Sequence, residues 1–310
     1  MIVNGRADPP IATAIIPRQA PAAIPKREVD RSGGPASKQP TVWYLDENWN
    51  GMQPSRAHTT PTPPITLIGA GRVGGSLFHA LRAAGVASLL VGRDDVGDGC
   101  ARAEVVVLCV PDAEIGAACS RVAAAAPRLR FIGHTSGAGR LEALAAATDR
   151  GAAGFSLHPL QTIPDAESDL TGAPVAIAAT TAAAATLARE IAERCQMVPF
   201  DVPEDSRAAY HAAAAIASNF LVALETSAEE LLAAAGIENG RELLAPLVLR
   251  TAANWAERGP AALTGPIARG DEETVARHFE AIAETTPELE SLYRALAERT
   301  REIAAAGDRR

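Results

Sequence analysis

The segment Ile65–Leu77 is the feature that most constrains the fold of this chain. Its first four residues, ITLI, include three that are β-branched and none that is charged, which is typical of a buried strand. Glycines follow at 69, 71 and 74, and apolar residues then recur at helical spacing. In such a strand–turn–helix unit, Gly69 makes the tight turn, Gly71 lets the backbone approach a pyrophosphate, and Gly74 lets the helix pack closely on the strand. The segment therefore predicts dinucleotide binding, with the pyrophosphate at the N-terminus of the helix.

The segments that follow alternate between strand and helix patterns. This alternation predicts a Rossmann-type α/β fold with a mostly parallel sheet. We expect strands at residues 65–68, 86–92, 105–110, 131–134, 155–158, 175–179 and 197–200. Only residues 93–104 separate the second strand from the third, VVVLCV, which is too few for a further helix and strand. The fold is therefore predicted to be abbreviated after strand two.

Strand patterns stop after residue 205, and an all-α C-terminal domain is predicted there. The expected helices span residues 206–235, 240–258, 271–283 and 286–306. Asp271 is a plausible N-cap, and Thr285–Glu288 has the pattern of a capping box. Three regions result: a disordered Pro-rich extension (1–62), a Rossmann-like NAD(P)-binding domain (63–204) and a helical substrate and dimerisation domain (205–310).

Composition excludes several classes of function. The net charge is −8 and the chain has no basic block, which argues against nucleic acid as a partner. The four cysteines and six histidines have no metal-ligand spacing, so no metal is predicted. Lysine occurs only at Lys26 and Lys38, so a catalytic lysine in the folded region is excluded. No apolar run reaches the length of a membrane span, and reduced thiols in the cytoplasm are the default expectation.

Arginines near the glycine segment indicate which dinucleotide binds. Arg93 follows the second strand, at the place where NADP sites carry an arginine for the 2′-phosphate and NAD sites carry a carboxylate. Arg72 lies within the glycine segment and adds charge, and Val73 beside it is assigned to the same cofactor site. Asp94 and Asp95 follow directly. NADP is therefore favoured, and NAD is not excluded. The alternative is that both arginines are solvated surface residues.

Two histidines are the candidates for catalysis. His158 lies between a strand and Pro159, at the kind of strand end where ligands bind. It could polarise a substrate carbonyl or supply a proton, or it could be a histidine satisfied by backbone at a turn. His211 and Ser218 are seven residues apart and share a helix face, with Asn219 adjacent. These groups could serve the site, or they could form a helix–helix hydrogen bond in the core.

Several longer motifs resemble one family. Together they cover residues 65 to about 305: IGAGRVG (68–74), LCVPD (108–112), HTSG (134–137), SLHPLQ (156–161), YHA…ASN (210–219) and LTGPIARGD (263–271). They are similar to Rossmann-like NAD(P)-binding proteins with a C-terminal domain of unknown function 2520 (DUF2520). That family is related to pyrroline-5-carboxylate reductases, β-hydroxyacid dehydrogenases and 6-phosphogluconate dehydrogenase-like reductases.

The resemblance implies an NAD(P)-dependent oxidoreductase that forms a homodimer through its helical domain. It implies hydride transfer from NADPH to a small carbonyl or imine substrate bearing a carboxylate, with ketopantoate as one candidate. A non-catalytic NADP(H) sensor is the alternative.

The motifs also suggest further site residues. His158, His211 and Asn219 are assigned to catalysis. The cofactor would also be contacted by Val110, Pro111 and Ser136, and the substrate by Gln161, Ser218 and Arg269. Related dehydrogenases carry a lysine where this chain has Ala215, which leaves His211 as the candidate replacement.

Overall fold

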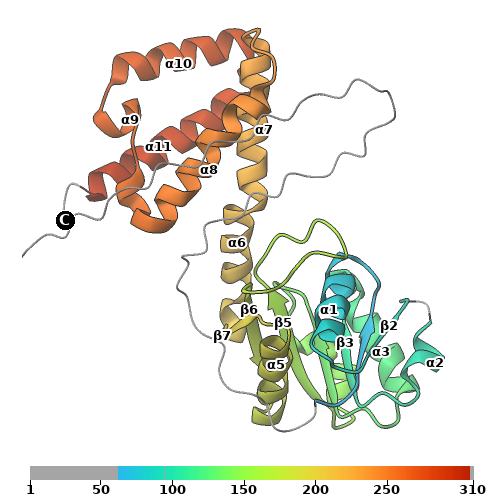
Figure 1. Ribbon diagram of the computed structural model, residues 1–310. Helices are drawn as coiled ribbons and strands as arrows, with labels where there is room; N and C mark the ends of the chain where they lie inside the picture. Colours follow the sequence, from blue (N-terminus) through green and yellow to red (C-terminus); the bar gives the residue numbers. More distant parts are fainter. Residues whose placement is uncertain (1–61, 94, 308–310) are drawn as a thin grey trace, which may run out of the picture. The chain divides into compact units, whose positions relative to one another are not determined.

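The computed structural model describes residues 62–93 and 95–307 (Figure 1). They belong to Met52–Arg310, the second of two units into which the chain divides. The predicted extension over residues 1–62 lies outside the described part except for Thr62. Asp94 also lies outside it.

The described strands form one seven-stranded sheet in the order β2-β1-β3-β4-β5-β6-β7. The strands are β1 (Ile65–Ile68), β2 (Ser88–Val91), β3 (Val105–Leu108), β4 (Phe131–His134), β5 (Ala153–Pro159), β6 (Pro174–Ala179) and β7 (Val198–Asp201). All neighbouring pairs are parallel except β5 with β6, which are antiparallel. The mostly parallel sheet is thereby confirmed.

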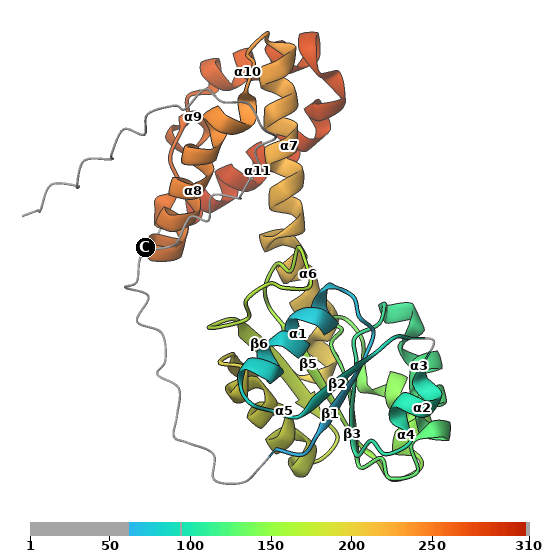
Figure 2. The same ribbon diagram turned by 45° about the vertical axis from the view of Figure 1, so that its right-hand side comes forward.

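Helices cover both faces of the sheet, because the central strands are apolar on both sides (Figure 2). In β3, Val105 and Val107 join one buried cluster, and Val106 and Leu108 join the other. The first cluster includes residues of α1 (Arg72–Ala83) and α5 (Ala182–Arg194). The second includes residues of α2 (Val96–Cys100), α3 (Ile115–Ala125) and α4 (Ala145–Thr148).

The connection from β2 to β3 is short, as predicted. Among the described residues it holds only α2, a helix of five residues. This helix packs closely on the sheet. Val96 and Cys100 are buried, and a Cβ atom on Gly99 would lie 2.8 Å from a methyl carbon of Val91 on β2. The second strand consequently lies at the edge of the described sheet, next to β1.

An aromatic ring fills the space beside a glycine in the middle of the sheet. A Cβ atom placed on Gly133 of β4 would lie 2.4 Å from the ring of Phe155 on β5. The two residues face each other in the register of the parallel pair, and Phe155 is fully buried. Only glycine at position 133 leaves room for this ring.

The C-terminal region is helical, as predicted. Its helices are α6 (Arg207–Ala217), α7 (Asn219–Ala234), α8 (Gly240–Arg258), α9 (Pro266–Arg269), α10 (Glu272–Thr285) and α11 (Glu290–Gly307). Short 3₁₀ turns lie at Asp112–Glu114, Leu141–Leu144, Glu204–Ser206, Gly259–Ala262 and Pro287–Leu289. None of the helices in the described ranges is long and apolar enough to cross a membrane.

Two details of the helix prediction differ from the structure. The helix expected over residues 206–235 is interrupted at Ser218, whose φ of −125° and ψ of −71° lie outside the helical region, although its N–H still bonds to Ala214. Asp271 caps α10 as predicted, accepting from the N–H of Thr274 at 3.1 Å. The capping box at 285–288 does not form, because the Thr285 hydroxyl donates back to the carbonyl of Ala281.

Candidate active site

The carboxyl ends of four parallel strands meet at one edge of the sheet. The glycine turn follows β1, Val110 follows β3, Ser136 follows β4, and His158 lies near the end of β5. Ligands of open α/β sheets bind outside the carboxyl ends of the strands. The topology therefore brings the predicted cofactor residues and His158 to the same edge.

The glycine turn has the geometry that dinucleotide binding requires. Gly69 has a φ of +108°, and a Cβ atom there would lie 2.5 Å from the carbonyl oxygen of Cys109. A Cβ atom on Gly74 would lie 1.9 Å from the carbonyl oxygen of Gly69, so a side chain would force α1 away from the turn. At Gly71, the N-cap of α1, a Cβ atom would meet nothing within 4 Å. The first and third glycines are thus required by packing, while the second borders open space at a helix N-terminus.

An arginine at the end of β2 lies beside a carboxylate. Arg93 donates to both oxygens of Glu114, at 3.0 and 3.3 Å, and both side chains are largely exposed. Arg121 of α3 donates to the backbone carbonyl of Arg93 at 3.4 Å. Arg93, Arg121 and Glu114 are therefore neighbours at the end of β2. On the glycine turn, Arg72 is exposed and Val73 is half-buried.

The turns after β3 and β4 are tightly held. Val110 is buried and Pro111 is exposed. Ser136 is buried: its N–H donates to Nδ1 of His134 at 3.2 Å, and its hydroxyl accepts from the N–H of Gly139 at 2.7 Å. Its hydroxyl therefore helps to shape the turn that carries Gly137.

His158 and His211 meet beside this turn. A Cβ atom on Gly137 would lie 2.8 Å from Nε2 of His158 and 2.5 Å from Nδ1 of His211. The two imidazole centroids are 5.8 Å apart. Nδ1 of His158 lies 2.7 Å from the hydroxyl oxygen of Tyr210. The structure thus brings together both predicted histidines, although they are distant in the sequence.

Burial keeps His134 and His158 neutral at physiological pH. Desolvation, together with the positive charges of His211 and Arg207, lowers the pKa of His158 to about 4, and Asp112 opposes that shift. Desolvation and Arg207 likewise lower the pKa of His134 to about 4. At neutral pH, His158 is therefore an uncharged imidazole that can donate one hydrogen bond and accept another.

A buried arginine holds α6 against the sheet. Arg207 is only 1% exposed, and it donates to the hydroxyl of Ser156 on β5 at 2.7 Å and to the carbonyl of Ser136 at 2.6 Å. These bonds join the start of α6 to the strand of His158 and to the turn of Gly137. Because Tyr210 and His211 lie one turn further along α6, Arg207 places both of them beside His158.

The other predicted site residues have different surroundings. The Gln161 amide donates to the carbonyl of Asp169 at 2.7 Å. Ser218 lies at the interruption between α6 and α7, Asn219 is exposed at the start of α7, and Arg269 is exposed at the end of α9. Within the described residues, no hydrogen bond or ring contact joins these four side chains to the histidine pair. Their assignment to the site stays a prediction.

Sequence reasoning missed Arg207, Tyr210 and Arg121 as site residues. Tyr210 was visible in the YHA motif, directly before a candidate histidine. Arg207 begins an otherwise Ala-rich helix, where an arginine one turn before two polar aromatic residues was a usable signal. Arg121 gave no signal, because its proximity to Arg93 depends on how α3 packs beside β2.

Comparisons with known proteins agree with this architecture. Residues 91–159 match the profile of the Rossmann-like domain, and residues 173–300 match the profile of the domain of unknown function DUF2520. The comparison with curated protein sequences gives no significant match.

Solved structures with the same fold include a putative NADP oxidoreductase from Bacteroides fragilis. It is 22% identical, with a TM-score of 0.65 over 77% of this chain and 98% of that one. A Thermotoga maritima protein is also 22% identical, with a TM-score of 0.63 over 79% of this chain and 100% of its own. Pyrroline carboxylate reductase from Plasmodium falciparum, solved with NADP bound, is 12% identical, with a TM-score of 0.52 over 78% and 98% of the two chains. The chain thus combines a match to the Rossmann-like domain with a C-terminal match to DUF2520, and it shares the fold of these solved structures.

Proposed function

We propose that this protein is an NADP(H)-dependent reductase that acts on a small carbonyl or imine substrate bearing a carboxylate. The observation that carries the proposal is the meeting of His158 and His211 beside Gly137, at the sheet edge that also bears the glycine turn. A 2-keto acid such as ketopantoate is one candidate substrate. The solved structures named above share the fold, and two of them are described as a putative NADP oxidoreductase and a pyrroline carboxylate reductase with NADP bound.

The residues at the glycine turn fit a dinucleotide. The open space at Gly71 and the free N–H groups at the start of α1 suit a pyrophosphate. Arg93 now pairs with Glu114, and Arg121 lies beside it. In the complex, the 2′-phosphate of NADPH would take the place of Glu114 as the partner of the Arg93 guanidinium. The bound cofactor would supply a hydride to the electrophilic carbon of the substrate.

The two histidines would serve the oxygen or nitrogen atom of the reacting double bond. As an uncharged imidazole, His158 can polarise this atom by donating a hydrogen bond, as neutral imidazoles do in other enzymes. His211 is exposed, so it can deliver a proton to the same atom and recover one from solvent. Arg269 is the candidate partner of the substrate carboxylate, because a guanidinium binds a carboxylate through two parallel hydrogen bonds.

A second copy of the chain is the proposed protein partner. Large apolar side chains of α6, α7 and α8 are more than half exposed: Ile216, Phe220, Val222, Leu243, Leu247, Leu249 and Trp255. Exposed apolar surface on this scale marks an interaction site, and no helix of the described residues is long and apolar enough to cross a membrane. Homodimerisation through the helical region accounts for it.

NADPH oxidation tests the reductase proposal directly. The full-length protein is assayed with a panel of 2-keto acids and cyclic imines, with NADH as the cofactor control. His158→Asn should lower kcat by roughly 10²- to 10⁴-fold, the usual contribution of a positioned acid–base group, and should leave the Kd for NADPH unchanged. His79→Asn, which changes an exposed histidine of α1, is the matched control and should keep full activity.

The alternative, an NADP(H) sensor without chemistry, predicts a different outcome. Such a protein would bind NADPH with the same affinity but would oxidise it with no member of the panel. Equal turnover by wild type and His158→Asn would also contradict the proposed role of His158.

A further inference from the structure

Tyr210 forms the only hydrogen bond that any described residue makes with the His158 ring. Its hydroxyl oxygen lies 2.7 Å from Nδ1, and the two rings meet edge-on with centroids 5.6 Å apart. Within the described residues, Nε2 of His158 has no hydrogen-bond partner. That nitrogen and the adjacent Cε1 lie next to Gly137, each 2.8 Å from the position of a Cβ atom there.

The direction of the Tyr210–His158 hydrogen bond follows from the chemistry of the two groups. Burial raises the pKa of the Tyr210 hydroxyl to about 12, so the phenol keeps its proton. A phenol O–H is a strong donor and a weak acceptor, whereas the bare nitrogen of a neutral imidazole is a strong acceptor. The reverse direction would also leave the phenol proton without an acceptor among the described residues. The phenol therefore donates to Nδ1.

We propose that Tyr210 is a positioning residue that fixes His158 in the neutral tautomer with its proton on Nε2, the ring nitrogen that lies next to Gly137. Donation from Tyr210 occupies the lone pair of Nδ1, so the single ring proton must reside on Nε2. The groups that face this ring are Tyr210 and His211 from α6, Arg207 at the start of α6, and Asp112 after β3. A nearby guanidinium disfavours a second proton on the ring.

Gly137 completes the arrangement. Any side chain at position 137 would place a carbon within 3 Å of both imidazoles, so only glycine lets both rings pack against this turn. A substrate carbonyl or imine atom that reached Nε2 would accept a hydrogen bond from it, close to His211. This consequence for catalysis rests on the proposed reductase function, whereas the tautomer itself does not.

The test reads the tautomer directly. Long-range ¹H–¹⁵N NMR correlations of the full-length protein, labelled with ¹⁵N-histidine, distinguish protonated from unprotonated ring nitrogens. His158→Asn identifies the His158 signals by their loss. Wild-type protein at pH 7.5 should show a protonated Nε2 and an unprotonated Nδ1, and Tyr210→Phe should show a mixture of the two tautomers. Tyr210→Phe should also lower kcat about tenfold, with the KM for NADPH unchanged.

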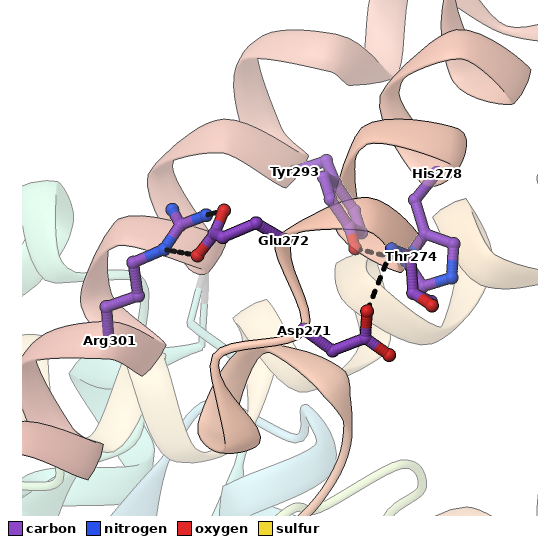
Figure 3. Close-up of polar contacts among 6 residues, drawn as sticks. All are labelled: Asp271, Glu272, Thr274, His278, Tyr293 and Arg301. Carbon is purple, nitrogen blue, oxygen red and sulfur yellow. Dashed lines mark hydrogen bonds and ion pairs between the residues drawn. The ribbon is translucent and has the colours of Figure 1, made fainter.

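The chain contains a matched control for this substitution. His278 and Tyr293 form a second pair with the same 2.7 Å distance between Nδ1 and the hydroxyl oxygen (Figure 3). Tyr293→Phe should change the signals of His278 and leave the His158 tautomer and kcat unaltered.

The outcomes separate the two proposals. A proton on Nδ1 of His158 in the wild type, or an unchanged tautomer in Tyr210→Phe, would overturn this inference even if the protein is an active reductase. The predicted tautomer in a protein that reduces no member of the substrate panel would support the inference and reject the proposed function.

Discussion

The guanidinium of Arg207 donates a 2.6 Å hydrogen bond to the carbonyl oxygen of Ser136, which ties the first turn of α6 to the loop after β4. Arg207 is fully buried, and a second bond connects it to Ser156. The relative positions of His158 and His211 therefore depend on one buried side chain that contacts neither ring through a hydrogen bond.

Replacing the guanidinium of Arg207 with a lysine ammonium should destabilise the protein. Arg207→Lys removes the two-armed geometry and leaves buried acceptors unpaired, so we expect the free energy of unfolding to fall by roughly 2–4 kcal/mol. Urea denaturation followed by circular dichroism measures the change. Arg140→Lys is the control, because Arg140 pairs with Asp205 at an exposed site and should cost less than about 1 kcal/mol. Equal losses in the two variants would contradict the role given to Arg207.

Stability should decline as the pH falls from about 6.5 to about 4. The pKa values of His134 and His158 are lowered from 6.5 to about 4 in the folded protein, chiefly by burial. Between these values the unfolded chain binds protons that the folded protein does not, so acid favours unfolding. Each histidine can contribute roughly 3 kcal/mol, which is fully present above pH 6.5. Urea midpoints measured across this range should fall less steeply in His158→Asn, and an identical slope would argue against the prediction.

Two glycine substitutions should separate folding from cofactor binding. Gly74→Ala forces a Cβ atom against the Gly69 carbonyl and should cost about 3 kcal/mol or more of stability. Gly71→Ala meets no protein atom and has a φ of −78°, which alanine adopts freely, so its melting temperature should not change. If a pyrophosphate lies against Gly71, the same variant should bind NADPH at least about tenfold more weakly, a loss of ~1.4 kcal/mol. Fluorescence titration of NADPH provides the measurement, and unchanged affinity would remove the pyrophosphate from this position.

The choice between NADPH and NADH should depend on Arg93 and Glu114. Arg93→Ala should raise the Kd for NADPH about tenfold and leave that for NADH unchanged, since only NADPH carries the 2′-phosphate. Glu114→Gln removes the carboxylate that forms an ion pair with Arg93 and would compete with the 2′-phosphate, so NADPH should bind more tightly than in the wild type. Isothermal titration of both cofactors tests the pair, and a parallel loss of NADH affinity in Arg93→Ala would show that the arginine does not read the phosphate.

A single charge on α7 should weaken self-association. Val222 is 66% exposed in the chain, so Val222→Glu should leave the fold of each copy intact while burying a carboxylate in the proposed interface. Sedimentation velocity should show a shift from dimer toward monomer. Leu89→Glu, at a leucine on β2 that is 50% exposed, is the control and should sediment as the wild type does. A wild-type protein that is monomeric at all concentrations would exclude the dimer.

Local patterns were sufficient to predict the sheet and most of the helices. The apolar run of β3 predicts a strand that is buried on both faces, and Gly69 after β1 suits a turn with positive φ, so these local structures could be predicted from the residues themselves. The interruption at Ser218 was not predictable, since an Ala-rich sequence with serine is compatible with one continuous helix.

The site was predicted only in part, for a related reason. His158 and His211 could be identified by their motifs. Their common contact with Gly137 could not, because it arises only when β4 and β5 lie side by side. The pairing of Arg93 with Glu114 likewise depends on the packing of α3. Contacts between distant segments follow from tertiary packing, which local periodicity does not encode.

The packing of Phe155 against Gly133 links two positions that evolution can change only together. A larger residue at 133 would require a smaller one at 155, and the strands that carry Ser136 and His158 would shift with them. Among relatives of this chain, we therefore expect the residues at these two positions to co-vary in size.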